Sequence, residues 1–525
     1  MRHILVLLLV LALGGCAGND GAGQPLEKDQ LVRLSDSEIR GLDPQKYSDL
    51  ASLRIAADQF EGLVRFDADG RAVPGLAESW TVSADGLAWT FRVRDSLRFS
   101  DGAAIDARLF ERLWKRLNDP ETASPHVPLF AVIDSVAASG DGQLVVTLSS
   151  PFPQLPELMA HPAMAALPMH IIDQRGDGWT AVRPLVTSGA YRLARWRLND
   201  RLELERNPRW HGGEAPVARI MWRPVDDSLA AMRLFLAGAA DIAGDYPQTR
   251  HDWLKRERPD AVRNGDYLGS YYFAFNTRQS PFDDVRVRRA LAMAVDRQWI
   301  ADTLLPMGNA PAWGVVPPAL YDGQGSRPGW AAWPRKNQLR EARRLLVQAG
   351  YHAGHKLRFE IRINSSAEHR RMAVAMAAMW RPLGVEAQIL NSESSLHFAA
   401  MRRGEFALAR SGWIADLPAA ENFLAVHRSD AGAINYSGYA SPAYDAALDR
   451  AGREADPERR QALFRTAEMM LIEDAPVIPL YYYRTGSLVG PRVAGWRDNA
   501  GNIHPSATLS LRRDQQAGNG ARPTS

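Results

Sequence analysis

Seven consecutive residues, Arg410 to Asp416, combine a fixed cation, a glycine, a flat aromatic ring and a carboxylate. The stretch follows a short apolar run and precedes Pro418, which is typical of a strand that opens into a loop. A carboxylate attracts an ammonium group, a glycine exposes backbone N–H and C=O groups, and an aromatic ring forms an apolar wall. The stretch therefore favours a zwitterion with an exposed backbone, such as a peptide. The alternative is a strand that enters an ordinary polar loop and whose Trp413 belongs to the core.

The sequence contains none of the short motifs that mark common catalytic centres. It lacks a phosphate-binding Gly-Lys-Ser loop, an HExxH zinc helix, a Gly-x-Ser-x-Gly elbow and a GxGxxG placed between a strand and a helix. His352 and His355 are three residues apart, but they lie in a Gly-rich turn without a nearby pair of carboxylates, so no metal is expected there. We predict that the protein is not an enzyme and uses no cofactor. Catalytic groups can also converge from distant segments, so a hydrolase stays an alternative.

Length and charge exclude some classes of protein. A chain of 525 residues is too long for one hydrophobic core, and three or four domains are expected. The 63 basic and 60 acidic side chains are interspersed and leave a net charge of +3. This near-neutral balance gives no support for nucleic-acid binding.

The only cysteine, Cys16, lies at the end of an N-terminal targeting pattern. Arg2 precedes an apolar run from Ile4 to Leu13, which is too short to cross a bilayer as a mature helix. The following Leu-Gly-Gly-Cys is similar to a bacterial lipobox, so residues 1–15 are predicted to be a lipoprotein signal peptide and Cys16 to carry lipid. Residues 16–30 then form a flexible tether, and residues 515–525 a disordered tail. The protein is expected outside the cytoplasmic membrane, tethered to a membrane by this lipid; a plain signal peptide is the alternative.

Periodicity predicts the elements that position the stretch from Arg410 to Asp416. Apolar residues at helical spacing predict helices at 106–117, 228–236, 284–305, 337–349, 368–380 and 456–473. Alternating or apolar runs predict strands at 88–94, 143–148, 201–206, 357–363, 386–390 and 477–483. The alternation of strands and helices in the second half predicts an α/β body there.

Nine further stretches, in the same order along the chain, resemble the oligopeptide-binding proteins of bacterial ABC importers, which are family 5 of the extracytoplasmic solute-binding proteins. They are FEGL at 60–63, PGLAESW at 74–80, WTFRVR at 89–94, FSDG at 99–102, DPETASP at 119–125, SGAY at 188–191, ERNP at 205–208, PFDDVRVR at 281–288 and VIPLYYY at 477–483. Each is weak alone, but together with residues 410–416 they extend over most of the chain.

The resemblance implies a fold class. The family has an α/β, two-lobed periplasmic-binding-protein fold that closes like a clamp, with an extra third domain on the N-terminal lobe. Lobe I would comprise residues 31–62, 188–268 and 484–514, the extra domain residues 63–187, and lobe II residues 269–483. The chain would cross between the lobes near Gly269 and near Arg484, and a hinge of two crossings permits closure by a few backbone rotations.

The resemblance also assigns roles to residues near the opening stretch. Asp416 matches the carboxylate that takes the α-ammonium of a peptide. Gly412 and Ile414 match positions that pair with the peptide through backbone atoms, as an added strand would. Arg410 and His369 match cations that are available to the peptide's own carboxylate.

Aromatic residues complete the implied site. Tyr267, Tyr272 and Tyr482 match tyrosines that line the family's cleft, although tyrosine also favours strand cores, which is the alternative. Trp413 matches the wall of a side-chain pocket, and His126 stands where the family has a tyrosine. At three other positions this chain has Ser52, Leu305 and Ser394 where the family has different residues. The length and side-chain preference of the ligand therefore stay open.

The predicted function is that of a lipid-anchored receptor. It would bind short peptides in a closing cleft and deliver them, as a monomer, to the permease of an ABC importer. A receptor for cell-wall (murein) peptides or another small solute is an alternative on the same fold. A hydrolase outside the cytoplasmic membrane, or a sensor that presents its ligand to a signalling partner, is an alternative of another class.

Overall fold

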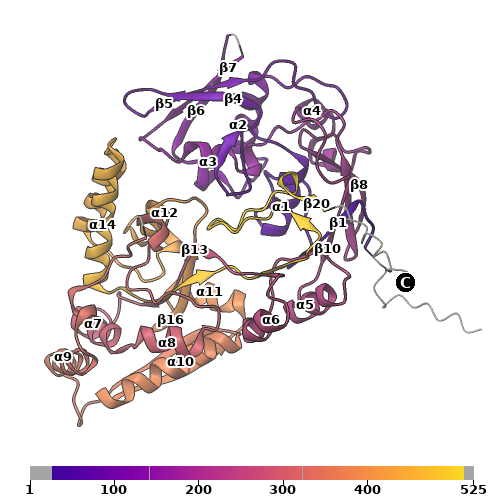
Figure 1. Ribbon diagram of the computed structural model, residues 1–525. Helices are drawn as coiled ribbons and strands as arrows, with labels where there is room; N and C mark the ends of the chain where they lie inside the picture. Colours follow the sequence, from indigo (N-terminus) through magenta and orange to yellow (C-terminus); the bar gives the residue numbers. More distant parts are fainter. Residues whose placement is uncertain (1–25, 141, 322, 513–525) are drawn as a thin grey trace, which may run out of the picture.

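The computed structural model describes residues 26–140, 142–321 and 323–512. The predicted signal peptide, Cys16, most of the predicted tether and the tail 515–525 lie outside these residues. Within the described part, no helix is both long enough and apolar enough to cross a bilayer. Figure 1 shows the N-terminal elements in violet above the C-terminal ones in pink and orange, with the yellow C-terminal segment between them.

A seven-stranded sheet is built from segments that are far apart in the sequence. Its strand order is β12-β18-β11-β1-β10-β9-β8, and β1 is parallel to both β10 and β11. The apolar residues of β1 alternate between two cores, with Leu31 in one and Val32 in the other, so both faces of the sheet are covered. Bounds are β1 Gln30–Ser35, β8 Tyr191–Arg197, β9 Arg201–Arg206, β10 Arg219–Pro224, β11 Ile242–Ala243, β12 Val262–Arg263 and β18 Ser487–Val489.

Helices cover this sheet on both sides. Helix α1 (Leu50–Gln59) begins at Asp49, whose side chain accepts the backbone N–H of Ser52, and packs in the core that contains Leu31. Helices α5 (Ser228–Leu236) and α6 (His251–Glu257) contribute to the core around Val32. The helix predicted at 228–236 is confirmed.

A four-stranded antiparallel sheet forms a separate layer (Figure 1). Its order is β4-β5-β7-β6, with β4 Ala77–Val82, β5 Ala88–Val93, β6 Ile133–Ser139 and β7 Gln143–Leu148. Helix α2 (Ala107–Asn118) packs against it and begins at Asp106, whose carboxylate accepts the N–H of Leu109, as predicted. The remaining elements of this region are β2 Val64–Phe66, β3 Ala72–Pro74, α3 Leu155–Met159 and α4 Met169–Arg175.

A five-stranded sheet organises the C-terminal half and carries the stretch from Arg410 to Asp416. Its order is β15-β14-β16-β13-β17, and β16 is antiparallel to β13 but parallel to β14. The first five residues of the stretch end β16, and Asp416 lies in the loop beyond it. Bounds are β13 Asp266–Phe275, β14 Leu357–Asn364, β15 Val385–Ser392, β16 Leu408–Ile414 and β17 Val477–Arg484.

The helices of the C-terminal half differ from prediction at one point. The single helix predicted at 284–305 is wrong, because the chain forms α7 (Val285–Ala294) and α8 (Arg297–Leu304) instead. Val295 and Asp296 adopt extended backbone angles, and the Asp296 carboxylate begins α8 by accepting the N–H of Trp299. The other elements are α9 Arg335–Gln348, α10 Ala367–Trp380, α11 Ser394–Arg403, α12 Ala420–Leu424, α13 Pro442–Arg453, α14 Pro457–Asp474, β19 Val493–Ala494 and β20 Ser510–Leu511.

Two neighbouring crossings connect the seven-stranded and five-stranded sheets. The chain passes from β12 to β13 through Asn264 and Gly265, and returns from β17 to β18 through Thr485. The guanidinium of Arg484 donates to the Asn264 side chain at 2.8 Å and pairs with Asp266 at 2.6 Å. Thr485 N donates to Gly265 O at 2.9 Å. The two crossings are therefore bonded to each other; the exact lobe boundaries stay a prediction.

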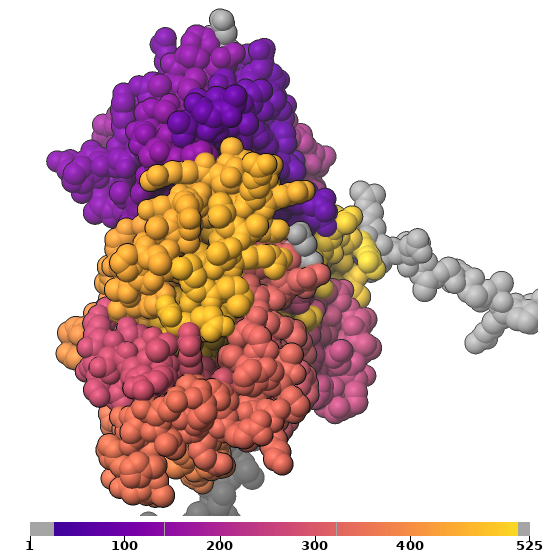
Figure 2. All heavy atoms as spheres, turned by 90° about the vertical axis from the view of Figure 1, so that its left-hand side faces the viewer, coloured from indigo at the N-terminus to yellow at the C-terminus, as the bar shows by residue number. Residues whose placement is uncertain are grey.

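The four-stranded region also contacts the C-terminal half. In Figure 2 the gold surface that includes α14 lies directly below the violet N-terminal region. The buried Arg460 of α14 donates to Pro151 O at 3.0 Å and pairs with Glu421 of its own half at 3.1 Å. This contact joins the two regions through α14 and the segment that follows β7.

Candidate functional site

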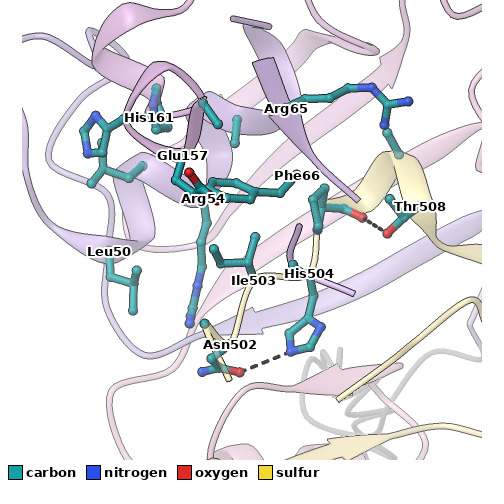
Figure 3. A pocket seen from close by; sticks show the side chains of 18 of the residues that line it. Leu50, Arg54, Arg65, Phe66, Glu157, His161, Asn502, Ile503, His504 and Thr508 are labelled. Carbon is teal, nitrogen blue, oxygen red and sulfur yellow. Dashed lines mark hydrogen bonds between the residues drawn. The ribbon is translucent and has the colours of Figure 1, made fainter. Parts of the chain in front are cut away.

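A cavity of about 610 Å³ lies where the three sheet-containing regions meet. Its wall comes from α1, the β2 and α3 region, the segment after β19 and the loop after β16. Figure 3 shows side chains from these distant segments around one space. The residues that line it include Leu50, Arg54, Arg65, Phe66, Glu157, His161, Tyr267, Ile414, Asp416, Asn502, Ile503 and His504.

Asp416 lies on the cavity wall contributed by the C-terminal half. Asn422 holds its loop, because the side-chain oxygen of Asn422 accepts both the backbone N–H of Asp416 at 3.2 Å and the indole N–H of Trp413 at 2.8 Å. The Asp416 side chain is open to solvent, yet the protein around it raises the pKa of its carboxyl, an effect that Asn422 and His126 oppose. No salt bridge engages this carboxylate among the described residues.

Two other predicted site residues share this cavity. Ile414 is 48% exposed at the end of β16, where its backbone is paired with Gly269 of β13. Tyr267 is half-buried, and burial raises the pKa of its hydroxyl. Asp416, Ile414 and Tyr267 therefore lie on one cavity, although their roles as ligand contacts stay a prediction.

Arg410 does not line the cavity and is held inside an aromatic cluster. Its guanidinium donates to the hydroxyl of Tyr483 at 2.7 Å and lies 4.8 Å from the ring centroid of Tyr271. Tyr271 in turn stacks on Tyr481 at 4.6 Å. The cation is thus supported by π faces and a hydroxyl rather than by a carboxylate.

His369 belongs to the same aromatic cluster. Its Nδ1 lies 3.1 Å from the Tyr271 hydroxyl. Burial, together with the nearby charge of Arg410, lowers the pKa of His369 to about 3. The imidazole is therefore neutral near pH 7 in this structure, and its role as a cation for the peptide's carboxylate stays a prediction.

Tyr272 and Tyr482 also differ from the prediction that they line a cleft. Tyr272 is 3% exposed and Tyr482 is 7% exposed, and neither contributes to the cavity wall. The hydroxyl of Tyr482 donates to Gly314 O at 3.1 Å inside the C-terminal half. In this structure both rings occupy strand-core positions, which was the alternative weighed for them.

Gly412 makes room for Tyr483, a residue that the sequence analysis did not single out. A Cβ atom on Gly412 would lie 2.8 Å from the Tyr483 hydroxyl and 2.9 Å from Ser270 O. Tyr483 therefore packs over the glycine and reaches Arg410. The only signal for this role was the position of Tyr483 in the run of three tyrosines near the end of β17.

His126 lies behind the cavity wall rather than on it. Its Nε2 is 3.1 Å from Tyr47 O, and its ring is 4.7 Å from the ring of His161, which does line the cavity. Burial lowers the pKa of His126, whereas the negative charge of Asp416 opposes this shift. His126 is therefore close to the Asp416 loop but separated from the cavity by His161.

Several polar residues of the cavity were missed by the sequence analysis. Arg54, Glu157, His161 and His504 come from four segments, and no motif or spacing relates them. Burial raises the pKa of Glu157, and it lowers those of His161 and His504 to about 3. Within the described residues, no group of three or more His, Cys, Asp or Glu side chains is placed to hold a metal ion.

Comparisons with known proteins agree with this geometry. The family model "Bacterial extracellular solute-binding proteins, family 5 Middle" matches residues 71–435. The chain is 34% identical over 523 residues to the periplasmic oligopeptide-binding protein OppA of Salmonella typhimurium. The match covers 95% of this chain and 96% of that protein.

Two solved structures are similar over nearly their whole length. The Escherichia coli murein tripeptide binding protein MppA has a TM-score of 0.80 and 30% identity, covering 93% of this chain and 99% of that one. Haemophilus influenzae OppA in complex with RPPGFSPFR has a TM-score of 0.78 and 29% identity, covering 93% and 100%. These similarities confirm the predicted α/β, two-lobed fold, and the chain belongs to family 5 of the bacterial extracellular solute-binding proteins.

Proposed function

We propose that this protein binds oligopeptides between its lobes, outside the cytoplasmic membrane, and delivers them to an ABC importer. The observation that carries the proposal is the carboxylate of Asp416, which faces a cavity of about 610 Å³ without a cationic partner among the described residues. The α-ammonium of a peptide supplies the missing charge. Relatives over the full length are named for peptide binding, which supports the same ligand class.

The edge of β16 supports an extended peptide. The described ladder between β14 and β16 includes Leu408 and Ala409 only, whereas β13 pairs with β16 as far as Ile414. From Gly412 to Ile414 one edge of the strand therefore has no strand neighbour in the described part of the chain. An incoming peptide can add its main chain at such an edge, and the cavity next to it accommodates the amino end.

The lipid anchor and the permease partner are part of the same proposal. Lipid on Cys16 would keep the receptor at a membrane, near the transmembrane subunits of its permease. A Cys16→Ser variant should then move from the membrane fraction to the soluble fraction after cell disruption. We further propose a monomer that releases its ligand chemically unchanged; product formed from a peptide pool would instead support a hydrolase.

Acetylation of the peptide amine tests the proposed ligand class. Calorimetric titration with an unmodified tetrapeptide and its Nα-acetylated form should show strong loss of affinity for the acetylated form, because only the free amine carries a charge for Asp416. Equal affinities for the two forms would exclude the ammonium anchor. Absence of binding by both, and by longer peptides, would exclude the peptide function itself.

A receptor for murein peptides is a second candidate. It is favoured by the similarity to the murein tripeptide binding protein MppA. Mass spectrometry of the ligands that co-purify with the protein separates the two candidates, because murein peptides contain residues that ordinary peptides lack. A permease deletion that leaves a ligand-dependent response intact would support a sensor instead.

A further inference from the structure

Arg54 is a cation of the cavity wall that lacks a partner. It belongs to α1 and lines the cavity together with Leu50, Phe66 and Ile503 (Figure 3). Among the described residues it makes neither a hydrogen bond nor a salt bridge. Burial lowers the pKa of Arg54, an effect opposed by the charge of Asp36, but the group stays protonated at neutral pH. A positive charge is thus held in a partly desolvated place without a hydrogen bond or salt bridge among the described residues.

The other basic groups of the cavity are already satisfied or neutral. Arg33 donates to His504 O at 2.9 Å and to Ser506 Oγ at 2.7 Å, and it lies 4.3 Å from the Trp222 ring centroid. Arg65 pairs with Glu61 at 3.7 Å. With pKa values lowered to about 3, the two histidines of the wall are uncharged. Arg54 is therefore the unmatched cation of this wall within the described residues.

Arg54 and Asp416 both act electrostatically on the hydroxyl of Tyr267. Both line the cavity, and both charges act on the pKa of Tyr267, which Arg54 lowers and Asp416 raises. The two groups nevertheless make no direct pair with each other. Because both residues line one cavity of about 610 Å³ and an extended peptide advances roughly 3.3–3.6 Å per residue, a ligand anchored at Asp416 would place its first side chains in the space that Arg54 faces.

We propose that Arg54 binds a carboxylate of the ligand, and that the receptor prefers peptides with an aspartate or glutamate among their first three residues. The inference rests on the proposed peptide function and adds a side-chain preference to it. Arginine suits this role because its planar guanidinium binds carboxylates with two parallel hydrogen bonds. A neutral side chain at the same place would leave the cation uncompensated.

The experiment compares matched peptides on matched variants. Calorimetry measures the affinity of Ala-Ala-Ala-Ala peptides in which position 1, 2 or 3 is replaced by Glu or by Gln. At one or more of the three positions, the parent should bind the Glu form about fivefold more tightly than the Gln form. Arg54→Gln should abolish this ratio, and Arg54→Lys should keep part of it. The control Arg71→Gln removes the same charge from an exposed side chain outside the cavity wall and should leave the ratio unchanged.

Each alternative outcome has a definite meaning. If the parent binds Glu and Gln peptides equally at all three positions, the acidic preference is wrong while peptide binding stands. If Arg54→Gln changes the affinity of all peptides by one factor, Arg54 serves as a counter-charge for the protein's own Asp36 or Asp416, and the inference is also wrong. If no peptide of the set binds, the proposed function fails and the inference fails with it.

Discussion

Arg54 and Arg410 are both half-buried arginines near the junction of the lobes, but their surroundings differ. Arg410 is bound by the Tyr483 hydroxyl and covered by Tyr271, and its neighbour His369 is neutral. Arg54 faces the cavity without a hydrogen-bonding partner in the described residues. Arg410 thus has one hydrogen bond and an aromatic cover, although its Nε has no hydrogen-bond partner among the described residues, whereas Arg54 has no such contact on its own wall of the cavity.

The difference indicates where binding energy is available. A polar group that is already hydrogen-bonded gains little from a ligand, because a new bond replaces an existing one. A partly desolvated charge without a partner gains more, since its desolvation cost has been met during folding. Among the described residues, Asp416, Glu157 and Arg54 line the cavity without a salt bridge.

The largest effect is expected at Asp416. Asp416→Asn should weaken peptide binding by roughly 2–5 kcal/mol, because the peptide's ammonium would be buried without a counter-charge. Thermal unfolding should stay near that of the parent, since the side chain is open to solvent. Calorimetric titration measures the loss. An affinity within about threefold of the parent would show that Asp416 does not bind the peptide's ammonium group.

A buried carboxylate of the C-terminal half, Glu468, should control stability rather than binding. Glu468 accepts hydrogen bonds from Val316 N and the Ser326 hydroxyl, and burial raises its pKa from 4.5 to about 7. Because the folded state holds the Glu468 proton more tightly than the unfolded state, protonation stabilises the fold fully below about pH 4.5. This contribution is lost as the pH rises to about 7. Glu468→Gln should remove up to about 3 kcal/mol of this pH dependence. Urea unfolding at several pH values measures it, and an unchanged slope would contradict the assignment.

Acid should weaken binding through Asp416 itself. The pKa of this carboxyl is raised in the free protein, and a bound ammonium would lower it, so protons and peptide compete. Affinity should be full well above the free-state pKa and fall by up to about tenfold per pH unit below it. The comparison is sharpened by Asp416→Asn, whose weaker affinity should lack this dependence. A parent affinity that is constant down to about pH 4 would contradict the prediction.

The smallest effect is expected at Tyr482. Tyr482→Phe removes the hydrogen bond to Gly314 O and should lower the free energy of unfolding by about 1 kcal/mol. Peptide affinity should stay that of the parent, because the hydroxyl points into the C-terminal half and not into the cavity. A substantial loss of affinity with unchanged stability would instead place Tyr482 in the site after closure.

Local features of the fold were accessible from the sequence, whereas the site was accessible only in part. Asp106 and Asp456 mark helix starts because capping is a short-range interaction, and both helices form. The break at Asp296 was hidden by apolar residues that continue with helical spacing on both sides. In the site, residues 410–416 point to Asp416, but Arg54 and Glu157 join it only because the chain brings distant segments together. Nor does tyrosine spacing show that Tyr483, and not Tyr482, reaches Arg410.

The bonded crossings between the two large sheets have a consequence for signalling to a permease. Because Arg484 is tied to Asn264 and Asp266, and Thr485 to Gly265, the two connecting segments form one short ribbon. A ribbon bends readily across its flat face and resists twisting, so we expect the lobes to swing in one plane. Every occupied molecule would then present the same outline to the transporter, whatever the side chains of its cargo.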